Sequence, residues 1–132
     1  MTFRSAQSAG IMFIFGMIRS LFMLKVEGII RSSKLYDVQK ALADLGIPTF
    51  SSYEVKLSGI IKGHTGWRNK TSDFIPKSKI EILCNDGEHE KIVNAILESA
   101  KTGDKGDGIV FVYQVDKLIK IKNGQTGESA LK

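Results

Sequence analysis

Apolar and polar residues follow two different periods along the chain from Leu24 onward. An apolar run over 26–31 predicts a buried strand, and strict alternation over 50–57 predicts a half-buried one. Apolar residues recur at helical spacing in two further stretches, which predicts helices over 35–45 and 92–100. Three more strands are predicted at 79–84, 109–115 and 118–122.

The order strand, helix, strand, strand, helix, strand predicts an α+β fold. Two βαβ-like units of this kind build the ferredoxin-like βαββαβ sandwich, an antiparallel four-stranded sheet with both helices on one face. The run 109–115 is so apolar that we expect a central strand, and 118–122 is an extra C-terminal strand. The face without helices needs a cover, most simply the same face of another copy. The 132 residues fit one such domain.

The stretch Gly10 to Leu24 is apolar but lies before this pattern. A signal peptide would need a small-residue cleavage site, and none of the Ala-x-Ala type follows. A membrane span would need roughly 20 apolar residues, and Arg19 interrupts the run. A translation start at Met23 is the third interpretation and the favoured one, because the organised pattern begins there. We therefore expect residues 1–22 to be a poorly ordered extension and 23–132 to be the domain.

The composition of the chain excludes several classes of function. A formal net charge of +5 suits an anionic ligand or partner, but it is too small and too evenly spread to indicate nucleic-acid binding. Cys84 is the only cysteine, which excludes an intramolecular disulfide and indicates a reducing, cytoplasmic compartment. We expect Cys84 itself to be a small residue of the core. His64 and His89 lack metal-ligand spacing, and no nucleophile with a plausible base is evident. We expect neither a metal site nor an enzyme.

A polar, glycine-rich connection of about 20 residues joins the second and third strands. Neighbouring antiparallel strands need only about two to five residues, so this length indicates a functional segment. It carries Trp67 among basic residues, a combination that suits contact with another protein. The alternative is a disordered insertion with Trp67 folded back on the body.

Two features could bind phosphate. Thr102 to Gly108 contains three glycines in seven residues, which lets backbone N–H groups cradle phosphate oxygens, although an ordinary turn would have the same composition. Lys120 and Lys122 alternate with isoleucines, so a strand places both ammonium groups on one face, about 7 Å apart. A polyphosphate would offset their repulsion, and the alternative is that both are solvated.

Several motifs, in order, resemble the PII signal-transduction family over about 24–131. They are Lys62-Gly63-His64-Thr65, Asp73 to Lys77, Lys79 to Ile82, Thr102 to Gly108 and Gly124 to Gly127. The resemblance implies a compact homotrimer that binds ATP or ADP in clefts between subunits. It also implies that the long connection, here about 56–77, is the family's T-loop, which docks on transporters, enzymes or regulators.

The resemblance assigns residues to the two roles by position. The nucleotide site would contain Ile29, Ser51, Gly59, Glu81, Leu83, Thr102, Gly103, Gly106, Asp107, Gly108, Lys120 and Lys122. The partner-binding T-loop would present Ile60, Ile61, Lys62, His64, Trp67, Arg68 and Lys77. The family has arginines where Lys120 and Lys122 stand, and lysine keeps the charge but loses the bidentate fork.

The chain also departs from the family pattern. Ile109 replaces a phosphate-contacting lysine, and Ile60-Ile61 replaces an Arg-Gln pair whose glutamine helps to hold magnesium. Isoleucine cannot ligate a hard cation, so we expect magnesium to bind weakly at best and 2-oxoglutarate not to be sensed. The T-loop is shorter than usual and lacks the tyrosine that is uridylylated, which argues against control by that modification.

These observations predict an energy-state sensor that binds ATP or ADP and regulates a target such as a membrane transporter, to which the cytoplasmic protein would attach. It would not itself span a membrane. One alternative is a conventional nitrogen-regulatory PII protein that also senses 2-oxoglutarate. Another is a ferredoxin-like nucleotide hydrolase or phosphotransferase that uses His64, and a metal-binding trimer is the last.

Overall fold

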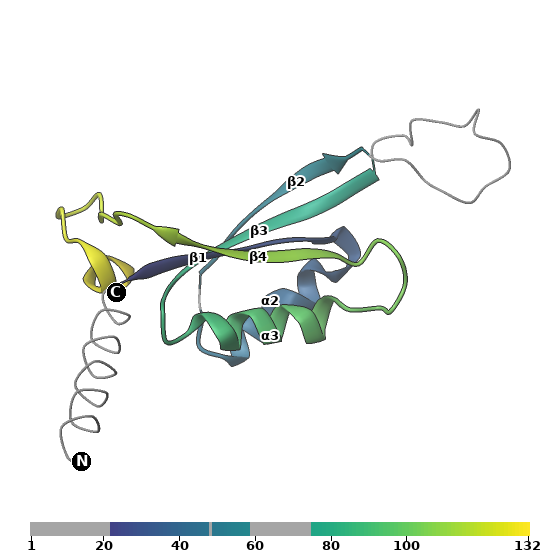
Figure 1. Ribbon diagram of the computed structural model, residues 1–132, viewed down its shortest axis with the longest axis horizontal. Coiled ribbons are helices and arrows are strands. Elements are labelled where there is room, and N and C mark those ends of the chain that lie inside the picture. Colours follow the sequence, from purple (N-terminus) through teal and green to yellow (C-terminus); the bar gives the residue numbers. More distant parts are fainter. Residues whose placement is uncertain (1–21, 48, 59–74) are drawn as a thin grey trace, which may run out of the picture.

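The computed structural model describes residues 22–47, 49–58 and 75–132 (Figure 1). The strands are β1 (Met23–Arg31), β2 (Ser51–Leu57), β3 (Ile75–Asn85) and β4 (Gly108–Val115). The helices are α2 (Leu35–Asp44) and α3 (His89–Ala100), with short 3₁₀ turns η1 (Ser32–Lys34) and η2 (Gly127–Leu131). Apart from Phe22, the extension predicted at 1–22 lies outside the described residues, as does most of the predicted T-loop.

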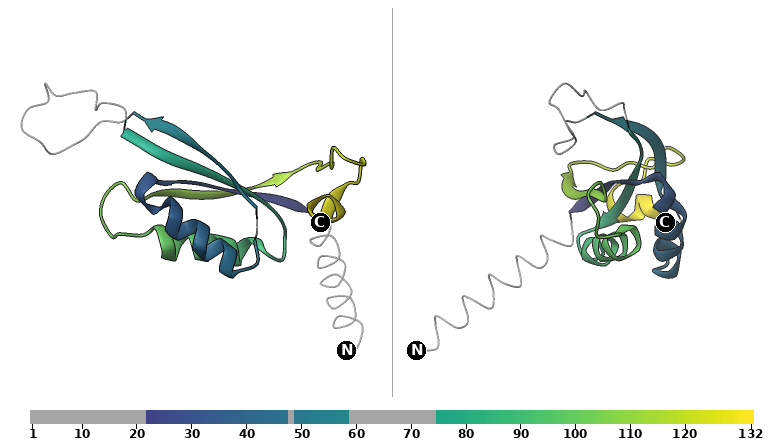
Figure 2. Two further views of the ribbon diagram at one scale, coloured as in Figure 1. Left: turned by 180° about the vertical axis from the view of Figure 1, so that it is seen from behind. Right: turned by 90° about the vertical axis from the view of Figure 1, so that its right-hand side faces the viewer.

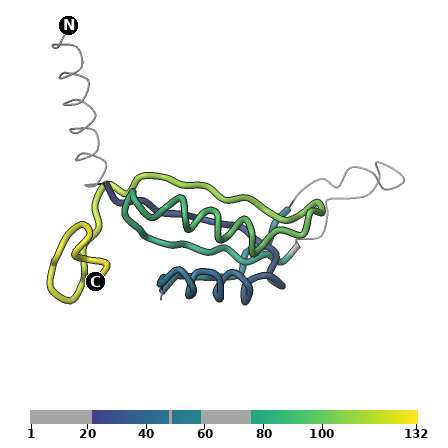
Figure 3. The backbone as a smooth tube through the Cα atoms, turned by 90° about the horizontal axis from the view of Figure 1, so that it is seen from below, coloured from purple at the N-terminus to yellow at the C-terminus, as the bar shows by residue number. Residues whose placement is uncertain are grey.

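The four strands form one antiparallel sheet in the order β2-β3-β1-β4. Both helices lie against the same face of the sheet, and they run side by side (Figures 2 and 3). This is the ferredoxin-like α+β arrangement, so the predicted fold class is confirmed. Neither helix of the described part of the chain has the length and apolarity that crossing a membrane requires.

The core lies between the sheet and the two helices. Alternate residues of β1 and β3, such as Val26 and Ile82, point to the helices, as the period of two in a strand requires. Val38 and Leu42 from α2 and Ile92 and Ile96 from α3 meet them at helical spacing. Cys84 belongs to this core and is fully buried, as predicted.

The prediction of a central strand over 109–115 is wrong, because β4 lies at an edge and β1 and β3 are the inner strands. Val110 packs against the core, whereas Ile109, Phe111 and Tyr113 lie on the face without helices. In the single chain these three residues are 61%, 37% and 41% exposed. An apolar run on both sides of a strand indicates that both faces become covered, but not which neighbour covers them.

The extra C-terminal strand over 118–122 is also absent. In the described structure this stretch takes part in a single bridge, between Ile119 and Thr126. The chain reverses within a few residues, since Gly124 has a φ of +72° and its N–H donates to the carbonyl of Lys120 at 2.8 Å. A local turn therefore takes the place of a strand that would have no partner among the described residues.

Candidate functional site

The loop from Thr102 to Gly108, the glycine loop, connects α3 to β4 and requires its glycines. Gly103, Gly106 and Gly108 have φ values of +90°, +96° and +102°, where other residues are strained. Gly108 also lies tightly against β1: a Cβ atom there would be 1.7 Å from the carbonyl oxygen of Ile29. The sequence of the loop thus permits both its path and its close contact with the sheet.

Asp107 holds the glycine loop in this shape. Its carboxylate accepts hydrogen bonds from the N–H groups of Thr102 and Gly103, both at 2.9 Å, and from the Thr102 hydroxyl. Arg31 Nε donates to the same carboxylate at 3.1 Å. The Thr102 hydroxyl and the two backbone donors hold the pKa of Asp107 well below its usual range. In this geometry the carboxylate organises the loop instead of pointing to a ligand.

Two cations lie beside the glycine loop. Arg31 Nη2 donates to the carbonyl of Lys105 at 2.6 Å, and Lys77 Nζ donates to the carbonyl of Gly106. Arg31 and Lys77 are paired across β1 and β3, so the sheet brings them together. The predicted T-loop residue Lys77 is therefore part of β3 and is buried. Sequence reasoning missed Arg31, whose proximity depends on strand register.

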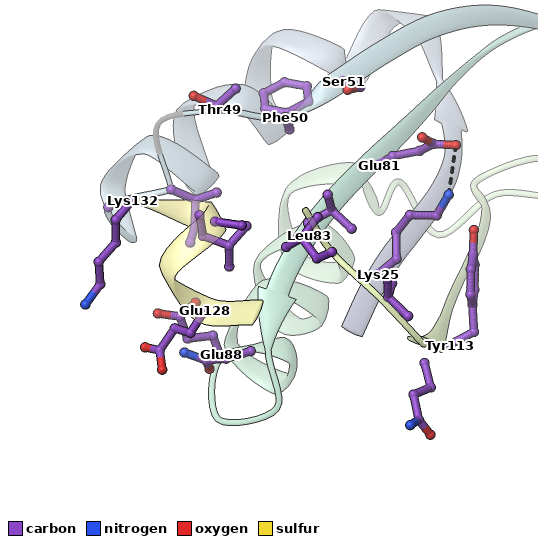
Figure 4. A pocket seen from close by; sticks show the side chains of 18 residues that line it. Lys25, Thr49, Phe50, Ser51, Glu81, Leu83, Glu88, Tyr113, Glu128 and Lys132 are labelled. Carbon is purple, nitrogen blue, oxygen red and sulfur yellow. Dashed lines mark ion pairs between the residues drawn. The ribbon is translucent and has the colours of Figure 1, made fainter. Parts of the chain in front are cut away.

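A cavity of about 850 Å³ lies at the other end of the sheet, a volume typical of small-molecule sites (Figure 4). Three predicted nucleotide residues, Ser51, Glu81 and Leu83, line it. Ser51 and Glu81 are opposite each other on β2 and β3. The rest of the lining includes Lys25, Phe50, Glu88, Tyr113, Leu118, Glu128 and Lys132. The prediction placed the first three residues around an adenine and a ribose.

A charged network covers the middle of the face without helices. Glu27 is only 4% exposed, and its carboxylate lies 2.8 Å from Lys25 Nζ and 3.2 Å from Lys79 Nζ. Burial raises the pKa of Glu27, but hydrogen bonds from Lys25, Tyr113 and Lys79 outweigh it and lower the pKa to about 2. The sequence places Glu27 and Glu81 on strands but does not show that lysines pair with them.

The predicted nucleotide residues form two groups in the single chain. Ile29 lies beside the glycine loop, because β1 and β4 pair there. Lys120 and Lys122 follow the opposite end of β4, in the C-terminal segment drawn in yellow (Figure 1). The eight residues of β4 alone span roughly 24 Å at ~3.4 Å per residue. A single chain therefore does not bring its glycine loop and its two lysines together.

The remaining predicted site residues lie outside the described part of the chain. They are Gly59, Ile60, Ile61, Lys62, His64, Trp67 and Arg68.

The chain is similar to proteins of one known family. The profile of the family described as "Nitrogen regulatory protein P-II" matches residues 23–125. A protein of that name from Pasteurella multocida is 41% identical over 112 residues, which cover 83% of this chain and all of the relative. "Nitrogen regulatory protein P-II 1" from Escherichia coli K12 is 40% identical with the same coverage.

A solved structure is similar as well. The crystal structure of Arabidopsis thaliana PII bound to citrate superimposes with a TM-score of 0.70 and 33% sequence identity. The match covers 83% of this chain and 90% of that one. Citrate is the ligand of that protein.

Proposed function

This chain belongs to the nitrogen regulatory protein P-II family, and from that premise we propose that it binds ATP or ADP between the subunits of a homotrimer. The names of its relatives are those of regulators, not of enzymes, so the chain is a non-enzymatic signal-transduction regulator as predicted. The nucleotide, the trimer and the target are the parts that we propose.

One observation carries the proposal: the two candidate phosphate-binding groups lie at opposite ends of β4. A site that uses both the glycine loop and Lys120 needs the loop of one subunit and the lysine of another. Such a head-to-tail contact, repeated by a rotation that closes, generates a ring, and the family resemblance makes that ring a trimer. The apolar side chains of Ile109 and Phe111 on the uncovered face favour burial in the same assembly.

The chemistry of the two groups suits an adenine nucleotide. Lys77 adds a positive charge beside the glycine loop, where Arg31 is paired with Asp107, and Lys120 and Lys122 of a neighbour would add to it around a phosphate chain. The cavity offers the carboxylate of Glu81 as an acceptor, which suits the exocyclic amino group of adenine, and the apolar side chain of Leu83. Ile60-Ile61 makes strong magnesium binding and 2-oxoglutarate sensing unfavourable.

Signalling would proceed through the segment that joins β2 to β3. Lys77, two residues after the start of β3, contacts the carbonyl of Gly106. A ligand that moves the glycine loop therefore acts on the base of the predicted T-loop, and ATP and ADP shift its conformations by their difference in affinity. A membrane transporter bound from the cytoplasm is our proposed target.

A second candidate is a conventional nitrogen sensor that also binds 2-oxoglutarate. One observation favours it: the relatives carry the name nitrogen regulatory protein. A calorimetric titration with and without 2-oxoglutarate separates the two candidates.

The test is calorimetry of the protein with ATP, ADP and GTP, each with and without Mg²⁺ and 2-oxoglutarate. We expect micromolar binding of ATP or ADP that 2-oxoglutarate does not change and that Lys120→Ala/Lys122→Ala abolishes. Lys40→Ala/Lys91→Ala, on the exposed faces of α2 and α3, is the matched control and should bind normally. Light scattering should give the mass of a trimer. A protein that binds no adenine nucleotide would contradict the proposal.

A further inference from the structure

The C-terminal segment, Gly127–Lys132, folds back onto the candidate site. The φ of +66° at Gly127 turns the chain after the bridge between Ile119 and Thr126, and the Gly127 N–H donates to the carbonyl of Leu118 at 3.1 Å. The five residues of η2 then lead to Lys132, whose carbonyl oxygen accepts a hydrogen bond from Lys120 Nζ. Lys120, one of the residues proposed to bind phosphate, is therefore already in contact with the protein's own backbone.

The same segment makes one wall of the cavity. Glu128, Ala130, Leu131 and Lys132 line it, and η2 contacts β3, which contributes Glu81 and Leu83 to the same cavity. Figure 4 shows Glu128 and Lys132 on this segment. Glu128 lies on the same side as Glu88, which comes from the start of α3 (Figure 4). Lys25 and Lys132 are cations of the same lining, so moving the segment away removes one carboxylate and one ammonium. Displacement of the segment therefore mainly opens space in the cavity.

The segment is held weakly. A 3₁₀ helix of five residues has poor hydrogen-bond geometry, and Leu131 remains 40% exposed. Elements with few buried apolar contacts open at a low cost in free energy. The contact between Lys120 and Lys132 is a single hydrogen bond at an exposed position, whereas a phosphate chain offers several anionic oxygens to the same ammonium.

We propose that the segment Gly127–Lys132 is an intramolecular competitor of the ligand, which occupies Lys120 and one wall of the cavity until an anionic ligand displaces it. This inference rests on the proposed function, since it assigns a regulation to that site. Binding then requires the displaced state of the segment. The apparent association constant is therefore the intrinsic one multiplied by the fraction of molecules in which the segment is displaced. The position of the segment in turn reports whether the site is filled.

The test compares the affinities of the full chain and of variants for ATP and ADP by calorimetry. Gly127→Ala strains the left-handed turn without a clash, because no atom lies within 4 Å of the new Cβ, and should tighten binding about fivefold. Deletion of 127–132 should tighten binding at least as much. Ser129→Ala, an exposed change within the same segment, is the control and should bind like the full chain.

Hydrogen exchange gives an independent readout. The amides of 127–132 should exchange faster when ATP or ADP saturates the protein. Slower exchange would mean that the segment closes over the ligand, and it would overturn the inference, as would Gly127→Ala binding no more tightly than Ser129→Ala. If no version of the protein binds a nucleotide, the proposed function itself fails. If the full chain binds nucleotide, and Gly127→Ala and the deletion of 127–132 bind it with the same affinity, only the proposal of an intramolecular competitor is refuted.

Discussion

The phenolic hydroxyl of Tyr113 donates a hydrogen bond to the carboxylate of Glu27, although 86 residues separate them in the sequence. The bond joins the edge strand β4 to the inner strand β1 on the face without helices. Lys25 completes the arrangement, since its ammonium lies 2.8 Å from Glu27 and 5.0 Å from the centre of the Tyr113 ring. A carboxylate that is 4% exposed thus obtains the partners that a buried charge requires.

Removing the hydroxyl alone should measure this bond. We expect Tyr113→Phe to lower the free energy of unfolding by about 2 kcal/mol, the size of a hydrogen bond to a charged group. Tyr36→Phe is the matched control, because Tyr36 is 74% exposed on α2, and it should change stability little. Urea unfolding of both variants at one protein concentration makes the comparison, and equal stabilities would contradict it.

Replacing Glu27 should change how stability depends on pH. The pKa of Glu27 is about 2 in the folded protein, against an ordinary value of 4.5. Ionised Glu27 therefore stabilises the fold above about pH 4.5, and this stabilisation is lost as the pH falls from 4.5 to 2.

Urea unfolding at pH 7 and pH 3 tests this. Glu27→Gln should cost about 2 kcal/mol at pH 7 and should lose less stability on acidification than the wild type. Glu98→Gln, at an exposed site on α3, should keep the wild-type pH dependence. Identical slopes in all three proteins would show that Glu27 is not a source of acid sensitivity.

Two glycines separate the effect of a clash from that of backbone strain. Gly108→Ala would place a Cβ 1.7 Å from the carbonyl oxygen of Ile29, and we expect a loss of at least ~3 kcal/mol. Gly124→Ala meets no atom within 4 Å, so its φ of +72° alone should cost about 1 kcal/mol. Thermal unfolding of the pair should rank them in this order, and a Gly108→Ala protein as stable as Gly124→Ala would refute the close contact with β1.

Cys84 should be unreactive in the folded protein. Its side chain is fully buried, and burial, with the nearby Glu88 and Asp86, raises the pKa of the thiol to about 11. The reactive thiolate is then scarce at pH 8. A thiol reagent should label the native protein only as fast as it unfolds, and should label it at once in urea. Rapid stoichiometric labelling without denaturant would contradict this placement.

The periods of two and 3.6 placed every element of the sandwich near its true position, because these patterns are local and follow from strand and helix geometry. They did not distinguish an edge strand from a central one, since Val110 and Phe111 are apolar on opposite faces of β4. They also predicted a strand at 118–122, where the turn at Gly124 returns the chain instead.

The candidate site divides in the same way. The sequence alone determined the glycine loop and the order of elements, because each depends on residue type and near spacing. The shared strand face predicted for Lys120 and Lys122 is wrong, because a turn replaces that strand. Only the tertiary structure decided that Arg31 and Lys77 lie beside the loop, that Glu27 is buried among its partners, and that loop and lysines lie at opposite ends of β4. These relationships depend on strand register and on the length of a strand. They involve residues far apart in the chain, so no local sequence pattern reveals them.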